Sequence, residues 1–285
     1  MFFSVIVPTH NRKETLAHCL QALCDQNHPN ETIVVDDGSQ DGTREMVAAR
    51  FQHVQYIFQE NRGPAAARNR GIRQARGDII AFTDDDCVPP RDWLAKLAAG
   101  YARHPEIAGA GGGIIAPNEM LEKNIFARYE RYLGWDVFRA RDQEILGGIE
   151  CPTGGTANMS YRRTVLEQVN GFDENFPVAA GEDADLNMRV CQLGYLLLYV
   201  PVRVIHLQEY SWKRFRRQFY LRGIGRNYYE QKHGAGYPSR WKIALRIIRR
   251  LIDFPLDLIR MRERKLAFIK LADGLITCQG QWVGK

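Results

Sequence analysis

Four short apolar runs divide the first 82 residues of the chain. They cover residues 2–8, 32–35, 54–58 and 79–82, and none of them keeps a strict alternation of apolar and polar positions. Such runs predict strands that are buried on both faces. Helical patterns separate the runs, so strand and helix alternate along the chain. This order predicts an α/β fold with a Rossmann-like, mostly parallel sheet and helices on both of its faces.

The first of the intervening helices has a recognisable start. Asn11 precedes it and Glu14 follows three residues later, a spacing typical of a capping box. Two further helices are expected over residues 43–50 and 65–76, the second closed by Gly77. Apolar residues recur at helical spacing in the first helix (Leu16, Cys19, Leu20 and Leu23).

Polar segments follow three of the predicted strands directly. They are Pro8–Asn11, Asp36–Asp37 and Asp84–Asp86. Ligands of parallel α/β sheets bind beyond the carboxyl ends of the strands, and these segments share that edge. We therefore expect the functional site there.

Three consecutive aspartates, Asp84, Asp85 and Asp86, end the fourth predicted strand, and two prolines then stop it. Adjacent carboxylates repel one another unless a cation lies between them. Mg²⁺ or Mn²⁺ suits this role, because hard ions prefer carboxylate oxygens and keep coordination positions free for phosphate. A solvated acidic turn is the alternative. Delivery of the carboxylates by a buried strand favours the metal site.

A second acidic segment, Asp36–Asp37, is followed by Gly38 and Ser39. These residue types favour a turn for backbone reasons alone. A carboxylate at this edge also accepts hydrogen bonds from a ribose or a base. Arginines on or beside the next helix are candidates for a diphosphate or a base, because the guanidinium fork matches both, although a surface charge is the ordinary role of an arginine (Arg62, Arg68 and Arg70).

The N-terminal part of the chain resembles glycosyltransferase family 2, the large inverting group with the GT-A fold. The resemblance covers roughly residues 3–210, and seven motifs occur in the expected order. They are residues 4–12, 34–43, 61–71, 84–86, 154–163, 171–174 and 181–186.

This resemblance implies a role for each matching residue. Pro8, Asp37 and Arg68 are expected along the nucleotide of an activated sugar donor, with Asp37 toward the base. Asp84 is expected near the ribose or the metal, and Asp85 is counted with it among the donor-binding residues.

The resemblance also implies a metal site and a catalytic base. Asp86 is expected to ligate Mg²⁺ or Mn²⁺, together with Asp84 and with His206 at the end of the apolar run 196–205. Asp183 matches the base that deprotonates the acceptor hydroxyl. Two structural alternatives stay open: His206 as a strand-end histidine, and Asp183 as one of the acids that favour a helix start.

Charge is distributed unevenly along the chain. The net charge is +6, yet residues 211–265 hold 16 Lys or Arg against four Asp or Glu, which leaves 23 against 29 for the remainder. A basic tail on an acidic body indicates an anionic partner, and membrane phospholipid suits it better than nucleic acid. Two basic helices are expected, over residues 212–232 and 241–252. The second fits a membrane-interface helix and fits packing on the catalytic domain nearly as well.

Localisation follows from what the sequence lacks. The six cysteines include no Cys-x-x-Cys pair, the N-terminus does not resemble a signal peptide, and no apolar stretch approaches the ~20 residues that span a bilayer. We therefore expect a cytoplasmic protein, peripheral on the inner face of the membrane if the tail binds lipid.

These observations predict a catalytic domain over residues 1–210 and a basic helical extension over 211–285. The expected activity is metal-dependent, inverting transfer of a sugar from a nucleotide-diphosphate donor to a hydroxyl of a glycan or lipid-linked acceptor, in cell-surface polysaccharide or glycolipid synthesis. The alternatives are a nucleotidyltransferase and an inactive module that binds membrane or nucleic acid. A nucleotidyltransferase would show a Gly-rich basic loop after the first strand, which Pro8–Arg12 does not provide.

Overall fold

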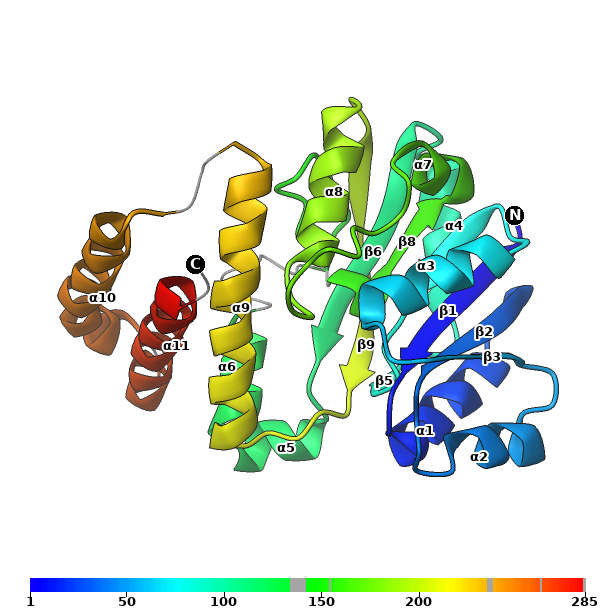
Figure 1. Cartoon of the computed structure of the whole chain (residues 1–285), viewed down its shortest axis with the longest axis horizontal. Helices are drawn as coiled ribbons and strands as arrows, with labels where there is room; N and C mark the ends of the chain where they lie inside the picture. The colour runs from blue at the N-terminus through cyan, green and yellow to red at the C-terminus, as the bar shows by residue number, and fades with distance from the viewer. Residues whose placement is uncertain (134–141, 154, 235–237, 262, 284–285) are drawn as a thin grey trace. The chain divides into compact units, whose positions relative to one another are not determined.

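The computed structural model describes residues 1–133, 142–153, 155–234, 238–261 and 263–283 (Figure 1). Gly154, part of one predicted motif, lies outside them. The chain forms two compact units. The first contains Met1–Pro117, Gly134–Glu174 and Asp183–Gln208, and the second contains Asn118–Leu133, Asn175–Glu182 and Glu209–Lys285.

A single sheet forms the centre of the first unit, in the order β3-β2-β1-β4-β8-β6-β9-β5, with β7 paired to β9. The first four strands are parallel, as predicted, whereas β8 runs antiparallel between β4 and β6. The strands are β1 Phe3–Thr9, β2 Asn30–Asp37, β3 Gln55–Gln59, β4 Ile79–Phe82, β5 Cys87–Val88, β6 Ile107–Ile115, β7 Ile145–Gly147, β8 Met159–Arg162 and β9 Leu196–His206.

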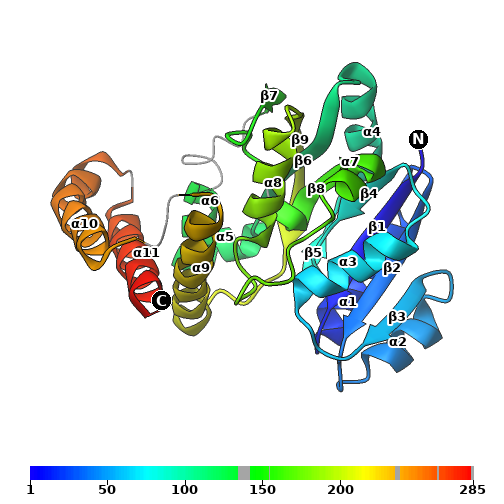
Figure 2. The ribbon, with the colours of Figure 1, turned by 45° about the horizontal axis from the view of Figure 1, so that its top comes forward.

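Helices cover both faces of this sheet, which confirms the predicted architecture (Figure 2). Alternate residues of β1 show the two faces: Val5 and Val7 belong to one buried cluster, and Ile6 belongs to the other. The first cluster includes residues of α1 Lys13–Cys24, α2 Thr43–Arg50 and α4 Trp93–Arg103. The second includes residues of α3 Pro64–Gln74, α7 Arg163–Gln168 and α8 Glu182–Gln192.

The predicted cap of α1 is wrong. Asn11 has a positive φ of 54°, and its side-chain oxygen accepts a hydrogen bond from the backbone N–H of Gln40 instead of capping the helix. The N–H of Lys13, at the start of α1, donates to Asp41 at 2.9 Å. The loop after β2 therefore supplies the acceptor that the capping-box pattern assigned to Asn11, and it ties the carboxyl ends of β1 and β2 together.

The second unit is helical and contains both basic helices expected in the tail. Its helices are α5 Asn118–Lys123, α6 Ile125–Tyr132, α9 Trp212–Lys232, α10 Arg240–Arg260 and α11 Arg264–Val283. Tyr129 of α6 packs with Phe215 and Phe219 of α9 and with Leu266 and Ile276 of α11. Gly223 and Gly280 let α9 and α11 approach closely, because a Cβ on either would lie 2.1 Å from a backbone oxygen of the other helix. Within the described residues, we find no helix whose apolar stretch is long enough to cross a bilayer.

Candidate active site

The three aspartates stand at the carboxyl end of β4, where the sequence predicts them. Every residue of β4 is buried, so the strand holds this segment firmly at the sheet edge. Their side chains point to different partners. Asp84 accepts a bond from Arg68 at 3.0 Å, Asp85 accepts one from Thr9 at 2.8 Å, and Asp86 lies 3.3 Å from Nε2 of His206.

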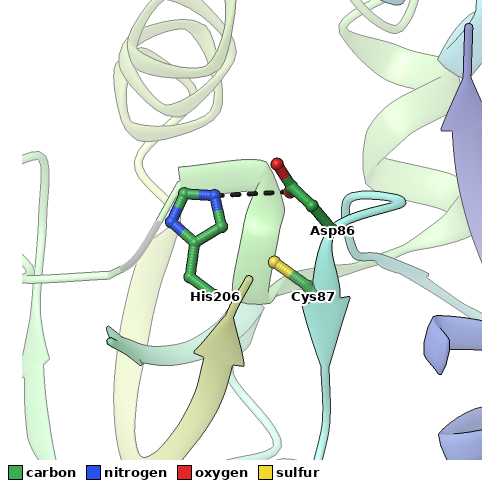
Figure 3. A group of neighbouring side chains, drawn as sticks. All are labelled: Asp86, Cys87 and His206. Atoms are coloured by element: carbon green, nitrogen blue, oxygen red, sulfur yellow. Dashed lines mark ion pairs between the residues drawn. The ribbon is translucent and has the colours of Figure 1, made fainter. Parts of the chain in front are cut away.

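His206 is the last residue of β9 and lies directly opposite Cys87 in the antiparallel pair of β5 and β9. The backbone bond from Leu207 N–H to the carbonyl of Asp86, at 2.7 Å, holds the two segments together. This pairing turns the imidazole toward the carboxylate of Asp86 (Figure 3). The predicted proximity of Asp86 and His206 is thus present in the structure, and a paired strand positions it.

Cys87 is a third potential donor beside this pair. Its sulfur lies within 4.8 Å of the ligand atoms of Asp86 and His206. The side chain is nevertheless fully buried and belongs to the same hydrophobic cluster as Cys19. Burial, together with the charges of Asp84 and Asp86, raises the pKa of the Cys87 thiol well above its ordinary value. Because hard ions such as Mg²⁺ and Mn²⁺ prefer oxygen ligands to sulfur, we assign Cys87 to the core.

The remaining donors fit a hard divalent cation. Asp86 and His206 supply a carboxylate and an imidazole. Asp84, expected as a further ligand, pairs with Arg68, and among the described residues it is not part of the group whose ligand atoms lie within 4.8 Å of one another. A carboxylate suits Mg²⁺ and Mn²⁺, and an imidazole ligand favours Mn²⁺ of the two. The chemistry of the site therefore matches the ions expected from the sequence.

Arg12 is a member of this site that the sequence analysis did not assign. Its Nη1 lies 2.9 Å from an oxygen of Asp85 and 2.9 Å from an oxygen of Asp86. Burial alone would lower the pKa of Arg12, but the charges of Asp85 and Asp86 outweigh it and raise that pKa. The guanidinium thus offsets part of the repulsion between the aspartates. The clue in the sequence is a cation immediately after the polar segment that ends the first strand.

Asp85 is buried to the same extent as Asp86, but its hydrogen-bond partners differ. It is buried, and its two carboxylate oxygens face Thr9 and Arg12. Burial raises its pKa to about 6, against the lowering influence of Arg12. These contacts give Asp85 a place in the hydrogen-bond network behind the site. Its predicted contact with the donor stays a prediction.

The donor-side residues lie on the neighbouring strand ends. Pro8 is buried in β1. Asp37, at the end of β2, accepts hydrogen bonds from the side chain of Gln59 at 2.7 Å and from the backbone N–H groups of Arg62 and Gly63, both at 2.8 Å. Asp37 therefore fixes the loop before α3 against the sheet edge. Its predicted approach to a base is untested.

Arg68 is buried although it is charged, and it lies in the first turns of α3. Its guanidinium bonds to Asp84 and lies 5.6 Å from the ring centroid of Phe172. A buried arginine held between a carboxylate and an aromatic ring is well ordered, which suits recognition of a planar or doubly charged group. The structure thus brings Arg68 to the aspartates.

Asp183 is the second residue of α8 and differs from the two acids beside it. Asp185 is fully buried and pairs with Arg189 at 2.8 Å, and Glu182 is buried as well. Asp183 is partly exposed, and its Oδ1 accepts the N–H of Ala184 at 2.8 Å. Of these three carboxylates, Asp183 is the most exposed.

Asp183 and the aspartates of β4 lie at the same edge of the sheet. Phe82, which ends β4, pairs with Met159, which begins β8, and Thr83 donates to the carbonyl of Ala157 at 3.0 Å. The 3₁₀ turn Gly155–Asn158 is therefore next to the aspartate segment. Oδ2 of Asp183 lies so close to this turn that a Cβ on Gly155 would be 2.4 Å from it.

Comparison with known proteins gives a consistent family. The model of Glycosyl transferase family 2 matches residues 4–169. Glycosyltransferase AglE of Haloferax volcanii is 31% identical over 70% of this chain and 64% of its own length. The glucosyl-dolichyl phosphate glucuronosyltransferase of the same organism is 30% identical over 76% of this chain and 74% of its own length. The pre-mycofactocin glycosyltransferase of Mycobacterium tuberculosis is 30% identical over 71% of this chain and 42% of its own length. The chain therefore spans less than two thirds of the length of this protein and of AglE.

Solved structures agree on the fold. The mannosyltransferase PcManGT from Pyrobaculum calidifontis, in complex with GDP-Man and Mn²⁺, superposes with a TM-score of 0.54 and 20% identity, over 98% of this chain and 73% of that chain. Residues 1–349 of Staphylococcus aureus TarS, in complex with UDP-GlcNAc, superpose with a TM-score of 0.54 and 17% identity, over 99% of this chain and 91% of that chain. These likenesses confirm the predicted GT-A fold. Because the family match covers more than half of the sequence, the chain belongs to glycosyl transferase family 2.

Proposed function

We propose that this protein is a metal-dependent, inverting glycosyltransferase that moves a sugar from a nucleotide diphosphate to a hydroxyl group. The observation that carries the proposal is the position of the Asp86–His206 pair at the same sheet edge as Asp183. One group of side chains suits a divalent cation, and a separate, partly exposed carboxylate lies near it. The catalytic residues would then all fall within residues 1–210, with 211–285 as an extension.

A nucleotide-sugar donor and Mg²⁺ or Mn²⁺ are proposed for two reasons. The donor chemistry of Asp84, Asp86 and His206 suits these ions. The related PcManGT structure contains GDP-Man and Mn²⁺, and the TarS structure contains UDP-GlcNAc. A divalent ion held by Asp86, His206 and Asp84 would neutralise the charge that develops on the departing diphosphate. Arg68, beside Asp84, would contact that diphosphate directly.

Asp183 would act as the base of a single displacement. Its carboxylate would accept the proton of the acceptor hydroxyl while that oxygen forms a bond to the anomeric carbon of the sugar. The bond from the anomeric carbon to the diphosphate breaks in the same step, and the nucleoside diphosphate carries away the electron pair. Attack opposite the leaving group inverts the anomeric configuration. This role requires the Asp183 carboxylate within hydrogen-bond reach of the acceptor hydroxyl, and its partial exposure supports the proposal.

The acceptor is proposed as a glycan or a lipid-linked saccharide. One relative is named as a glucosyl-dolichyl phosphate glucuronosyltransferase, which is a transferase to a lipid-linked sugar. The 3₁₀ turn Gly155–Asn158 touches Asp183 and would therefore border the acceptor. A role in cell-surface polysaccharide or glycolipid synthesis would follow from such an acceptor.

A panel of nucleotide sugars incubated with the protein and Mn²⁺ tests this proposal. We expect release of a nucleoside diphosphate from one donor, loss of that release in Asp86→Asn, and retention of donor binding without transfer in Asp183→Asn. Release of pyrophosphate or of a nucleoside monophosphate would contradict the proposal and indicate a nucleotidyltransferase. Loss of donor binding in Asp183→Asn would contradict its role as the base.

A further inference from the structure

Helix α10 packs on α11 through one face (Figure 1). Ile243 on this face is fully buried, and Phe254 meets the ring of Phe268 of α11 at 5.0 Å between centroids. Asp257, on the same face, accepts a bond from Lys270 at 2.7 Å. Phe254 follows Ile243 by 11 positions and Asp257 follows Phe254 by three, so the three residues lie along one side of the helix. The structure thus shows packing of α10 within the second unit, whereas the packing on the catalytic domain expected as one alternative from the sequence stays a prediction.

The opposite face of α10 is apolar and exposed. Ile252 follows Ile243 by nine positions, which is about two and a half turns, so the two side chains point to opposite sides. The exposed residues recur every three or four positions, and we call them the α10 stripe. They are Trp241 (70% exposed), Leu245, Ile248, Ile252 (65%), Leu256 and Ile259 (81%).

Cations border this stripe. Lys242, Arg249 and Arg260 are exposed and follow one another at helical spacing beside it. Across its length, α10 contains six Lys or Arg and two Asp, a net charge of +4. The side chain of Arg249 is 85% exposed, and its nearest carboxylate, Asp253, lies 3.7 Å away, so this pair leaves most of the charge in solvent.

We propose that the α10 stripe binds the surface of an anionic phospholipid bilayer. A helix that lies in the plane of a membrane buries its apolar side at the acyl boundary and places cations among anionic headgroups, with a Trp at the interface. The α10 stripe has all three features on one side. The alternative occupant is a second copy of the chain, but a symmetric contact would place two helices of charge +4 against each other.

This inference does not depend on the proposed transferase activity, since vesicle binding requires no donor. One side of α10 packs on α11 and the other binds lipid.

Sedimentation of the full chain with vesicles tests the proposal. The vesicles are phosphatidylcholine alone or phosphatidylcholine mixed with phosphatidylglycerol. The stripe variant is Ile252→Glu with Ile259→Glu. The matched control is Leu146→Glu with Leu193→Glu, which places two charges on exposed apolar positions of the first unit (42% and 55% exposed). A charge variant, Lys242→Gln with Arg249→Gln, tests whether the cations beside the α10 stripe contribute to binding. Circular dichroism shows whether each variant is folded.

We expect the wild type and the control to bind the anionic vesicles and to bind phosphatidylcholine more weakly. The stripe variant should lower the partition coefficient by on the order of 100-fold, because two large apolar side chains no longer leave water. The charge variant should lower it by on the order of tenfold. Equal binding of the wild type and the stripe variant, or equal binding to both vesicle types, would overturn the proposal. So would a wild-type dimer in analytical ultracentrifugation that the stripe variant dissociates.

Discussion

Oδ2 of Asp183 lies 2.4 Å from the place that a Cβ of residue 155 would occupy, so only a glycine at position 155 leaves this carboxylate where it is. Gly155 also has a positive φ of 61°, which other residues rarely adopt. The turn before β8 and the start of α8 thus fit together through the absence of one side chain. This contact connects the proposed base with the strand next to the aspartates.

Gly155→Ala should displace the carboxylate of Asp183 while leaving the aspartate segment in place. We expect kcat to fall by on the order of 100-fold, as for a misplacement of about 1 Å, with donor affinity unchanged. Isothermal titration with the nucleoside diphosphate and initial-rate kinetics measure the two quantities. Gly194→Ala is the control, because Gly194 also has a positive φ (86°) but no atom within 4 Å of its Cβ position. A similar loss of kcat in both variants would show that strain alone, and not contact with Asp183, is responsible.

His206→Ala and Cys87→Ala should separate the metal ligand from its buried neighbour. His206→Ala should weaken Mn²⁺ binding by about 100-fold or more. Removal of a residue that only hydrogen-bonds to a metal ligand already weakens metal binding by about 10- to 100-fold, and His206 is a proposed ligand itself. Cys87→Ala should leave Mn²⁺ affinity unchanged and lower the free energy of unfolding by about 1 kcal/mol, because it leaves a small cavity in the core. Titration of Mn²⁺ followed by electron paramagnetic resonance measures the affinity. A loss of affinity in Cys87→Ala would show that the thiol is a ligand.

Arg12→Gln should destabilise the protein in the absence of a metal. Two buried carboxylates would lose their shared cation, and we expect the free energy of unfolding to fall by about 1–3 kcal/mol. The loss should be smaller than for a fully buried ion pair, because the Arg12 side chain is 40% exposed. Mn²⁺ should raise the Tm of this variant more than that of the wild type, since the ion replaces the lost charge beside Asp86. The control is Arg62→Gln, whose ion pair with Glu174 is more exposed. Equal Mn²⁺-induced shifts in the wild type and Arg12→Gln would contradict the proposed role of Arg12.

Asp85→Asn and Asp86→Asn should differ although the residues are adjacent. Both oxygens of Asp85 face protein donors, so an amide there should preserve Mn²⁺ binding. Asp86→Asn removes a carboxylate that faces His206, so Mn²⁺ binding should be lost. Calorimetric titration of each variant with Mn²⁺ checks this contrast. Lost binding in Asp85→Asn with retained binding in Asp86→Asn would reverse the assignment of the two carboxylates.

Local patterns in the sequence predicted the first half of the fold well. The apolar runs gave β1 to β4 and their parallel order, because each run is long enough for a strand and is separated from the next by a helical segment. The antiparallel insertion of β8 between β4 and β6 could not be predicted in this way. That pairing joins residues about 80 positions apart (Phe82 with Met159), and no local period encodes it.

The candidate site was predicted to a similar extent. Asp86 lies beside His206 and Asp84 beside Arg68, but among the described residues Asp84 does not join the group of potential ligands that Asp86 and His206 form; the roles of all four stay predictions. Arg12 was missed because a single arginine after a strand has no distinctive pattern, and its importance depends on the direction of two distant carboxylates. The cap of α1 was assigned to Asn11 for the opposite reason: the local pattern was present, but the loop after β2 supplied a better acceptor.

The central proposal is a cation held by Asp86 and His206, with Asp183 nearby. Anomalous diffraction from crystals soaked with Mn²⁺ and a nucleoside diphosphate locates that ion directly. We predict a single strong peak within ligand distance of the Asp86 carboxylate and Nε2 of His206, with the diphosphate bound to the same ion. A Mn²⁺ peak elsewhere, with the diphosphate bound far from Asp86, would contradict it.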